Sequence, residues 1–393
     1  MKPVYFDNNA TTAVAPEVLE AMLPYYRDRY GNPSSMHTFG GRIHREIENA
    51  RSQVAALINA EPEEIVFTSC GSESDNTALM SAVESFPHKR HVVTTRVEHP
   101  AILNFVRYLS RKGLRTTFLP VDRFGRIDHD LFLKALDDDT AIVSIMFANN
   151  ETGVIFPIAE MAEIVKEKGI LFHTDAVQAG GKLPLDVKKL AVDMLSLSGH
   201  KIHAPKGVGA LYIRSGTRFH PYLIGGHQEQ GRRAGTENVA PIIGMGVACE
   251  LAGDRLNIEA ARLAGLRDKL EKSLLRTCPD ARVNGDVTNR LPNTTNISFE
   301  YVEGEAILLR LDEYGICASS GSACSSGSLE PSHVLRAMGI PFTAIHGSIR
   351  FSLSRYTSEA EIDQVIELLP TIIGELRQLS PYGRDKITNK TCR

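Results

Sequence analysis

The sequence predicts an α/β protein whose central sheet is mostly parallel. Between Ile65 and Arg214, short apolar runs typical of buried strands alternate with segments of helical periodicity. Repeated strand–helix units of this kind build a mostly parallel sheet. Polar and glycine residues gather directly after several apolar runs, which predicts a ligand at the carboxyl ends of the strands. The length of 393 residues is sufficient for a second, smaller domain in the C-terminal part.

Composition and charge narrow the class of protein. The formal net charge is −3, and acidic and basic residues are interspersed, which argues against a nucleic-acid-binding surface. No apolar run approaches the length of a membrane span. The N-terminus reaches Asp7 before any apolar stretch. No signal peptide is therefore expected, and the cytoplasm is the predicted location.

The cysteine and histidine patterns do not indicate a metal site or a disulfide framework. Six cysteines are scattered along the chain without the C-x-x-C spacing of a zinc ribbon or a thioredoxin motif. His200 and His203 lack the glutamate that follows the first histidine in H-E-x-x-H. We therefore expect no bound metal in the active site.

The N-terminal region combines a polar turn with helix-like segments. Residues 7–12 read Asp-Asn-Asn-Ala-Thr-Thr, which favours a turn. An amphipathic segment around residues 18–23 and a Gly-Asn-Pro-Ser-Ser loop at 31–35 come before a charged helix that begins near residue 41. The region is either a plain helix and loop or an active-site loop, and the local sequence leaves both interpretations open.

The first chemical feature follows the apolar run 65–68, which is predicted to be a buried strand. A Gly/Ser-rich turn at 69–76 leads into an apolar helix at 77–83. Backbone N–H groups at such a helix start face outward, and the helix dipole favours an anion there. Gly71 and Ser72 are the candidate donors to a phosphate. The alternative is an ordinary helix cap.

Two further predicted strands end in polar residues. The strand at 91–97 runs into Glu98-His99-Pro100, where His99 is either a surface residue or an imidazole that stacks on a cofactor and moves protons. The strand at 141–148 runs into Asn149-Asn-Glu-Thr-Gly153. A helix is expected from about 158 to 168, because Gly169 follows as a stop signal.

The strand predicted at 170–178 delivers Asp175 and Gln178, and the strand at 194–198 delivers His200 and Lys201 after a glycine. A buried aspartate needs a partner, which is either a protonated pyridine nitrogen or a nearby arginine or backbone group. A lysine with a lowered pKa can form a Schiff base with an aldehyde cofactor such as pyridoxal phosphate. Taken alone, the Lys201 motif is weak evidence, because most lysines of this kind are solvated surface charges.

The remaining segments are predicted from pattern and turn signals. A strand is expected at 205–214, and the glycine-rich basic segment 225–236 is either a plain loop or a phosphate-facing loop. An amphipathic helix at about 258–275 is expected to lead into the second domain. In that domain we predict strands at 293–299 and 348–353 and helices at 304–314 and 359–379.

A second chemical feature is the run of small residues from Ser319 to Ser328, which contains the single thiol of Cys324. Such a composition does not build a core, and an exposed cysteine is a liability unless it is used. We therefore predict a reactive, thiolate-forming cysteine. Arg350 lies in a short apolar strand, where its guanidinium needs an anion. That anion is either a substrate carboxylate or a structural carboxylate.

Taken together, the chain resembles the cysteine desulfurases of the nitrogen-fixation (NifS) type over nearly its whole length. The residues that carry the resemblance are Asp7-Asn-Asn-Ala-Thr-Thr12, Gly31-Asn-Pro-Ser-Ser35, Glu98-His-Pro100, Ala148-Asn-Asn-Glu-Thr-Gly153, His173-Thr-Asp-Ala-Val-Gln178, Ser198-Gly-His-Lys201, Arg233-Ala-Gly-Thr-Glu-Asn238, Ser320-Gly-Ser-Ala-Cys324 and Arg350-Phe-Ser-Leu-Ser354.

The resemblance implies a homodimer with the fold of type I pyridoxal-phosphate enzymes. The large domain, residues 12–255, would contain a mainly parallel seven-stranded sheet. Residues 1–11 and 256–393 would form the smaller α/β domain that carries the Cys324 loop.

The resemblance also implies roles for individual residues. Lys201 would be the Schiff-base lysine, Asp175 would contact the pyridine nitrogen, and Gln178 the ring hydroxyl. His99 would stack on the ring and act in catalysis with Lys201 and Cys324. Gly71, Ser72, Ser198 and His200 would contact the phosphate, together with Thr236 of the partner subunit. Asn150 and Arg350 would bind the substrate carboxylate. Asn150 would also contact the cofactor.

The implied reaction converts L-cysteine to L-alanine and leaves the sulfur as a persulfide on Cys324. An iron–sulfur scaffold or another acceptor protein would then take the sulfur, and nitrogenase maturation is the implied context. Cys324 would contact an iron–sulfur cluster only during transfer. The alternatives are a selenocysteine lyase or an aminotransferase on the same scaffold, or a sulfur-carrying interaction scaffold without catalysis.

Overall fold

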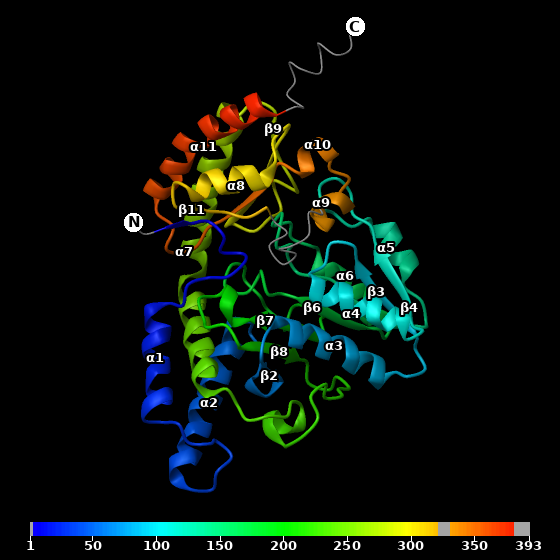
Figure 1. Ribbon diagram of the computed structural model, residues 1–393. Helices are drawn as coiled ribbons and strands as arrows, with labels where there is room; N and C mark the ends of the chain where they lie inside the picture. The colour runs from blue at the N-terminus through cyan, green and yellow to red at the C-terminus, as the bar shows by residue number, and fades with distance from the viewer. Residues whose placement is uncertain (1–2, 321–330, 381–393) are drawn as a thin grey trace.

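A seven-stranded sheet forms the centre of the larger part of the molecule (Figure 1). The computed structural model describes residues 3–320 and 331–380. The order of the strands across the sheet is β2-β8-β7-β6-β5-β3-β4. Only β8 runs antiparallel to its neighbours, so the predicted mainly parallel seven-stranded sheet is confirmed. The strands are β2 (Ile65–Thr68), β3 (His91–Thr95), β4 (Arg115–Leu119), β5 (Thr140–Ser144), β6 (Leu171–Asp175), β7 (Met194–Ser198) and β8 (Gly209–Ile213).

Both faces of this sheet are buried, as is typical of a parallel sheet between helices. Alternate residues of one strand enter different hydrophobic cores. Ile65 and Phe67 of β2 pack into the core that contains residues of α1, α2, α6 and the first half of α7. Val66, between them, packs into the core that contains residues of α3 and α4. The helices are α1 (Pro16–Arg27), α2 (Thr38–Leu57), α3 (Gly71–Ser85), α4 (Pro100–Arg111), α5 (His129–Ala135), α6 (Ile158–Glu167) and α7 (Val239–Thr277).

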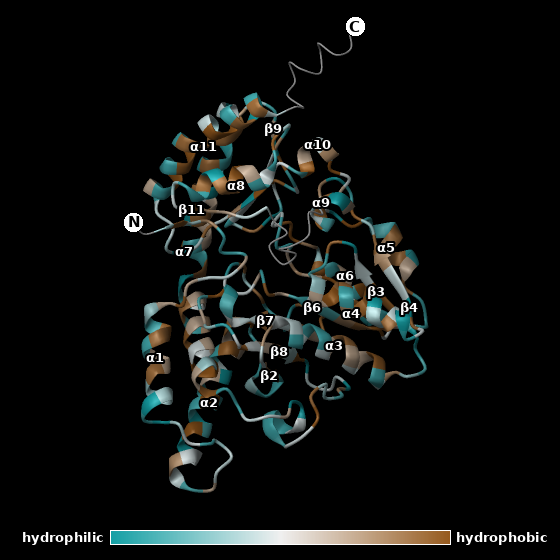
Figure 2. Ribbon diagram, in the orientation of Figure 1, coloured by the Kyte–Doolittle hydropathy of each residue, from teal (hydrophilic) through white to brown (hydrophobic). Residues whose placement is uncertain are grey.

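The smaller part of the molecule combines the chain's N-terminal segment with its C-terminal elements. β1 (Val4–Tyr5) pairs in parallel with β11 (Ile316–Cys317). Val4 and Phe6 lie in a separate core with residues of β10, β12, α8 and α11. Figure 2 shows apolar and polar residues alternating along α11, as expected for a helix with one buried face. The further elements are β9 (Ala281–Val283), β10 (Thr294–Phe299), β12 (Ser348–Ser352), α8 (Gly304–Asp312), α9 (His333–Ala337), α10 (Phe342–Ile345) and α11 (Glu359–Leu379).

The helix α7 runs through the boundary that the sequence predicted near residue 255. Its first half contributes to the core of the large sheet, and its second half to the core of the smaller part. The sequence predicted this helix only from about 258. Residues 240–249 are nearly all buried, so they lack the polar face that makes a helix recognisable from periodicity. The boundary itself stays a prediction.

Several predicted elements differ at their ends from those of the structure, and two of them lie next to the cavity. The helix expected at 77–83 is α3 and already begins at Gly71. The strand expected at 141–148 is β5, which ends at Ser144. The earlier start of α3 has a functional consequence, because it places the predicted phosphate donors in the first turn of a helix.

Candidate active site

A cavity of about 260 Å³ lies at the carboxyl ends of the sheet strands. Residues that follow β2, β3, β5, β6 and β7 line it together with one residue of β12. The structure brings together nearly all the predicted site residues in this cavity: Gly71, Ser72, His99, Asn150, Asp175, Gln178, Ser198, His200, Lys201 and Arg350.

Lys201 stands at the end of a short 3-10 turn, η2 (Gly199–Lys201), that follows β7 directly. Its Nζ donates to the carbonyl oxygen of Asn9 at 2.5 Å and to that of Ala10 at 2.7 Å. The lysine therefore reaches across the cavity to the N-terminal segment, which lies almost two hundred residues away in sequence.

Asp175 is the last residue of β6, and its side chain is buried. Burial raises the pKa of this carboxyl to about 6, and the N–H of Val177 and the charge of Lys201 partly counter the shift. Asp75 of α3 also lines the cavity. Burial, followed by repulsion from Asp175, raises the pKa of Asp75 well above its ordinary value. A cationic ring nitrogen placed here would therefore stabilise the ionised form of Asp175.

His99 caps the start of α4, where its Nδ1 accepts a hydrogen bond from the N–H of Ala101 at 3.1 Å. The neutral ring therefore carries its proton on Nε2. Burial lowers the pKa of His99 to about 4, with further contributions from Lys201 and His333. A neutral imidazole is suited to stacking on a ring and to accepting a proton.

The region around Gly71 has the features of a phosphate site. Gly71 and Ser72 are the first two residues of α3, whose backbone N–H groups have no acceptor within the helix. Within the part of the chain that the structure describes, the buried hydroxyl of Ser198 has no hydrogen-bond partner, so an acceptor in the cavity would satisfy it. A Cβ at position 71 would stand 2.9 Å from Val177 Cγ2. The glycine therefore allows a close approach to the helix start, and a phosphorylated cofactor fits the residues present.

Gln178 and a lysine that the sequence analysis missed lie next to this site. Gln178 Nε2 donates to the carbonyl oxygen of Asn9 at 3.0 Å. Lys182 lies four residues further along the chain, in a turn, and donates to the carbonyl oxygen of Gln178 at 3.1 Å. Burial, with repulsion from Lys201, lowers the pKa of Lys182 to about 7. The spacing of four residues between Gln178 and Lys182 was the only sequence feature that could have indicated that Lys182 lies near the site.

Arg350 is only 1% exposed and has a carboxylate partner. Its Nη2 lies 2.6 Å from Asp7 Oδ1, and its Nη1 donates to the carbonyl oxygen of Asn150 at 3.0 Å. The sequence left a structural carboxylate and a substrate carboxylate open as the partner. The structure contains the first and also places Arg350 on the cavity wall.

Residues 7–12, which we call the N-terminal strap, cross between the two parts of the molecule. Asn9 Nδ2 donates to the carbonyl oxygen of Asn150 at 3.1 Å and to Thr294 Oγ1 at 2.9 Å. Thr11 Oγ1 lies 3.2 Å from His200 Nδ1. Of the two alternatives for this segment, the structure supports an active-site segment.

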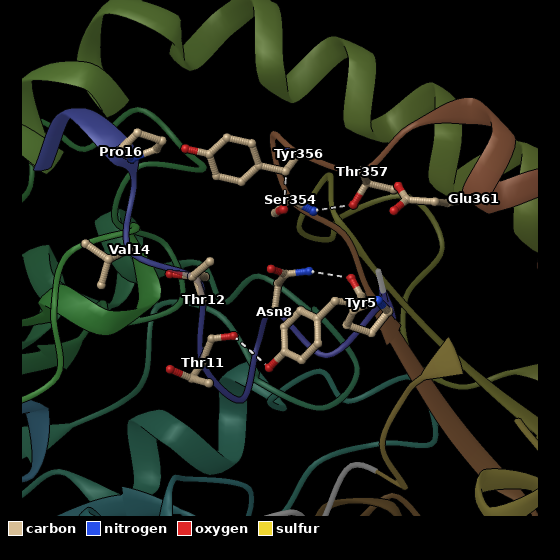
Figure 3. A pocket seen from close by; sticks show the side chains of 12 residues that line it. Tyr5, Asn8, Thr11, Thr12, Val14, Pro16, Ser354, Tyr356, Thr357 and Glu361 are labelled. Carbon is tan, nitrogen blue, oxygen red and sulfur yellow. Dashed lines mark hydrogen bonds between the residues drawn. The ribbon is translucent and has the colours of Figure 1, made fainter. Parts of the chain in front are cut away.

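A second cavity of about 550 Å³ lies against the strap (Figure 3). Asn9 and Ala10 line the first cavity. Asn8, Thr11 and Thr12 line the second, with Tyr356 and residues near the start of α11 (Figure 3). The side chains of the strap therefore divide between the two cavities.

Thr236 lies outside the cavity and is exposed. A buried ion pair holds the glycine-rich segment that leads to it. Glu229 accepts from Arg51 Nη1 at 2.6 Å and Nη2 at 2.9 Å, and Arg233 Nε donates to Glu73 at 2.8 Å. This segment is thus anchored to α2 and α3 close to the predicted phosphate site.

Cys324 lies outside the described residues. The described chain resumes at residue 331, and its first residues form hydrogen bonds to the cavity region. Ser332 donates a short hydrogen bond to the buried carboxylate of Glu151, and a ring nitrogen of His333 lies 2.9 Å from the carbonyl oxygen of Glu98. Ser332 and His333 therefore attach α9 to the segments that carry His99 and Asn150.

Comparison with known proteins places this fold and site in one class. The family model described as aminotransferase class-V matches residues 4–365, and the chain belongs to that family. Among residues 3–320 and 331–380, no helix has the length and apolar character needed to cross a membrane.

Individual relatives refine this assignment. A protein of Trichormus azollae named cysteine desulfurase is 61% identical, over 98% of this chain and 96% of its own. The cysteine desulfurase NifS of Azotobacter vinelandii is 58% identical, over 97% and 95%. A solved structure described as a NifS-like protein has a TM-score of 0.90 at 42% identity and covers 95% of this chain and 100% of its own. Within the class-V family the chain is thus of the NifS type of cysteine desulfurase, and the predicted resemblance is confirmed.

Proposed function

We propose that this enzyme removes sulfur from L-cysteine, releases L-alanine and holds the sulfur as a persulfide on Cys324. The observation that supports this most directly is the convergence of Lys201, Asp175, His99 and Arg350 on one cavity. These four groups supply a reactive amine, a carboxylate for a ring nitrogen, an imidazole and a carboxylate-binding cation.

The cofactor that fits this set is pyridoxal 5′-phosphate. When bound, it supplies an aldehyde that joins an amino group and a ring that withdraws electrons from the substrate's Cα. Lys201 would hold the aldehyde through its amino group, and Asp175 would balance the charge of the ring nitrogen. The first turn of α3, the hydroxyl of Ser198 and the ring of His200 would hold the phosphate.

Substrate binding and proton movement then fall to residues on the cavity wall. Arg350 and Asn150 bind the carboxylate of L-cysteine, which orients its Cα toward Lys201. The Nζ of Lys201 would accept the Cα proton and later return a proton to that carbon. The neutral ring of His99, which also lines the cavity, would supply a second site for a proton.

Sulfur transfer uses the thiol of Cys324 as a nucleophile. A free thiol ionises near pH 8.5, so the reaction requires the small fraction of thiolate that is present at neutral pH. The Sγ thiolate bonds to the substrate sulfur while the carbon–sulfur bond breaks. The electron pair of that bond stays on the carbon, and its protonation completes the methyl group of L-alanine.

The finer assignments concern the partners. We propose a homodimer in which Thr236 of one subunit completes the phosphate site of the other, since Thr236 is exposed and does not line its own cavity. An iron–sulfur scaffold is the proposed acceptor of the persulfide sulfur. The similarity to the NifS protein of Azotobacter vinelandii supports a connection to nitrogenase maturation.

The decisive experiment measures alanine and sulfide release from L-cysteine with a thiol reductant, at matched cofactor content. We expect equimolar products from the wild type and none from Cys324→Ala, with cofactor binding retained. Cys317→Ala is the control, because Cys317 lies in β11 outside the cavity, and it should retain turnover. Equal activity in Cys324→Ala would shift the assignment to a lyase. Inactivity of the wild type would point to another substrate or to a scaffold.

A further inference from the structure

Arg350, the predicted binding residue for the substrate carboxylate, is already paired with a carboxylate of the protein. The guanidinium already has two protein acceptors, Asp7 Oδ1 on Nη2 and the Asn150 carbonyl oxygen on Nη1. Its Nε is buried and, among residues 3–320 and 331–380, has no hydrogen-bond partner. The guanidinium lies on the cavity wall with its charge already paired.

Both charged residues are fixed to the same strand. Arg350 lies in β12 and exchanges backbone hydrogen bonds with Ser319. Asp7 forms a bridge with Ser352 of the same strand, and the neighbouring backbone groups of Phe6 and Asn8 bond to Ser352. The backbone therefore holds Asp7 and Arg350 close enough for their side chains to pair.

A substrate carboxylate that binds Arg350 becomes the second anion at one cation. Arg350 and Asp7 neutralise one another, so the incoming carboxylate gains less net attraction than it would from an unpaired arginine. The Asp7 side chain is 18% exposed, and two carboxylates at close range in a partly buried site repel each other. The same repulsion acts on the carboxylate of every amino acid that binds at Arg350, including that of the product L-alanine.

We infer that Asp7 is a positioning residue that acts through Arg350 and limits the affinity of the site for carboxylates. It competes with substrate and product for the same guanidinium, which keeps L-alanine from being retained after turnover. This inference rests on the proposed function for the identity of the substrate, and it assigns a role to a residue of the N-terminal strap.

The test is Asp7→Asn, because asparagine has the same shape and keeps an oxygen that can accept from Arg350 Nη2. Removing one repelling charge should lower the KM for L-cysteine and the inhibition constant of L-alanine, each by about tenfold. The value of kcat should stay level or fall, since the product leaves more slowly. Asp363→Asn removes a charge from an exposed ion pair with Lys269 and should change none of these values.

Two outcomes would overturn the inference. A KM that rises in Asp7→Asn would mean that Asp7 only orients Arg350. An unchanged KM and an unchanged inhibition constant would mean that Asp7 is structural. Asp7→Glu adds a check on charge, because it retains the anion and should not tighten carboxylate binding as Asp7→Asn does.

A calorimetric measurement on the wild-type holoenzyme tests the same idea without any variant. Propionate should bind no more than about tenfold tighter than neutral propionamide if Asp7 balances Arg350. A preference of about a hundredfold or more would show an uncompensated cation and overturn the inference. Because propionate carries no sulfur, this result stands even if the wild type releases no alanine from L-cysteine, which would defeat only the proposed function.

Discussion

The strand ends of the large sheet and the N-terminal strap contribute to the same cavity in different ways. Asp175 and Lys201 follow two neighbouring strands, β6 and β7, which pair in parallel. Their proximity follows from the order of the strands. Residues of the strap instead meet partners that are far away in sequence, including Lys201 and Arg350. The sheet positions the proposed catalytic residues, whereas the strap connects the cavity to the smaller part of the molecule.

This difference shows why the two regions should respond differently to substitution. A strand-end residue such as Asp175 has one chemical task in the cavity. A strap residue such as Asn9 has several structural partners, because it contacts Asn150 of one part and Thr294 of the other. We expect substitutions at the strand ends to lower catalytic activity. Substitutions in the strap should lower the free energy of unfolding and also alter substrate binding.

The largest expected effect comes from Asp175→Asn. This change removes the carboxylate that we propose for the ring nitrogen of the cofactor and keeps the side-chain volume. Activity should fall by about 10²–10³-fold, the range found when a single preorganised electrostatic partner is removed. Steady-state release of alanine from L-cysteine measures it, with cofactor content determined separately. Near wild-type activity would mean that Asp175 does not serve the ring nitrogen.

A smaller effect is expected from Asn9→Ala in the strap. The change removes bonds to Asn150, Thr294 and Asn293. It should lower the free energy of unfolding by about 1–3 kcal/mol, as measured by denaturant titration, and raise the KM for L-cysteine.

Asn8→Ala is the matched control for the strap. Asn8 is the neighbouring residue and faces the second cavity (Figure 3), and its amide bonds to the carbonyl oxygens of Tyr5 and Ser352. It should lose stability without a comparable change in KM. Equal changes in KM for the two variants would contradict the assignment of Asn9 to the active side of the strap.

The smallest effect is a pH-dependent difference in stability between Asp175→Asn and the wild type, both without cofactor. Burial raises the pKa of Asp175 to about 6, whereas the unfolded chain ionises near its ordinary value of about 3.9. Between these values the folded state binds more protons, so the wild type loses stability as the pH rises. The free energy of unfolding of the variant should therefore rise relative to that of the wild type over this range, by roughly 3 kcal/mol once the pH is above 6.

Urea unfolding of the two proteins at several pH values from about 4 to 7 checks this prediction. Asparagine keeps an oxygen that can accept from the N–H of Val177, so that hydrogen bond should contribute little to the difference. A difference in stability that does not vary with pH would contradict the raised pKa of Asp175.

The predictions made from sequence were most successful where chemistry follows a strand. Lys201, Asp175 and Gln178 were predicted to lie together because each stands at or shortly after the end of an apolar run, and parallel strands end at one edge; the structure places all three on one cavity. Gly71 and Ser72 also line this cavity, although the helix was expected to begin later, and their role as phosphate donors stays a prediction. The first half of α7 was missed, because a helix that is buried all round carries no periodic signal.

The contacts of the strap could not be predicted in the same way. Its polar residues favour a turn, and a turn has many possible positions. Asp7, Asn9, Asp75 and Lys182 were not recognised as parts of the site, since the groups they meet come from other elements of the fold. The sequence also left open which anion Arg350 pairs with, and the structure supplies Asp7.

By itself, the sequence determined the α/β class and the family, and it predicted which residues gather at the strand ends. These features depend on local patterns of burial and turn formation, which neighbouring residues control. Only the tertiary structure decided that the N-terminal strap holds Lys201 and Arg350 and lines two cavities. Such contacts join segments hundreds of residues apart, and they form only when both cores bring those segments together.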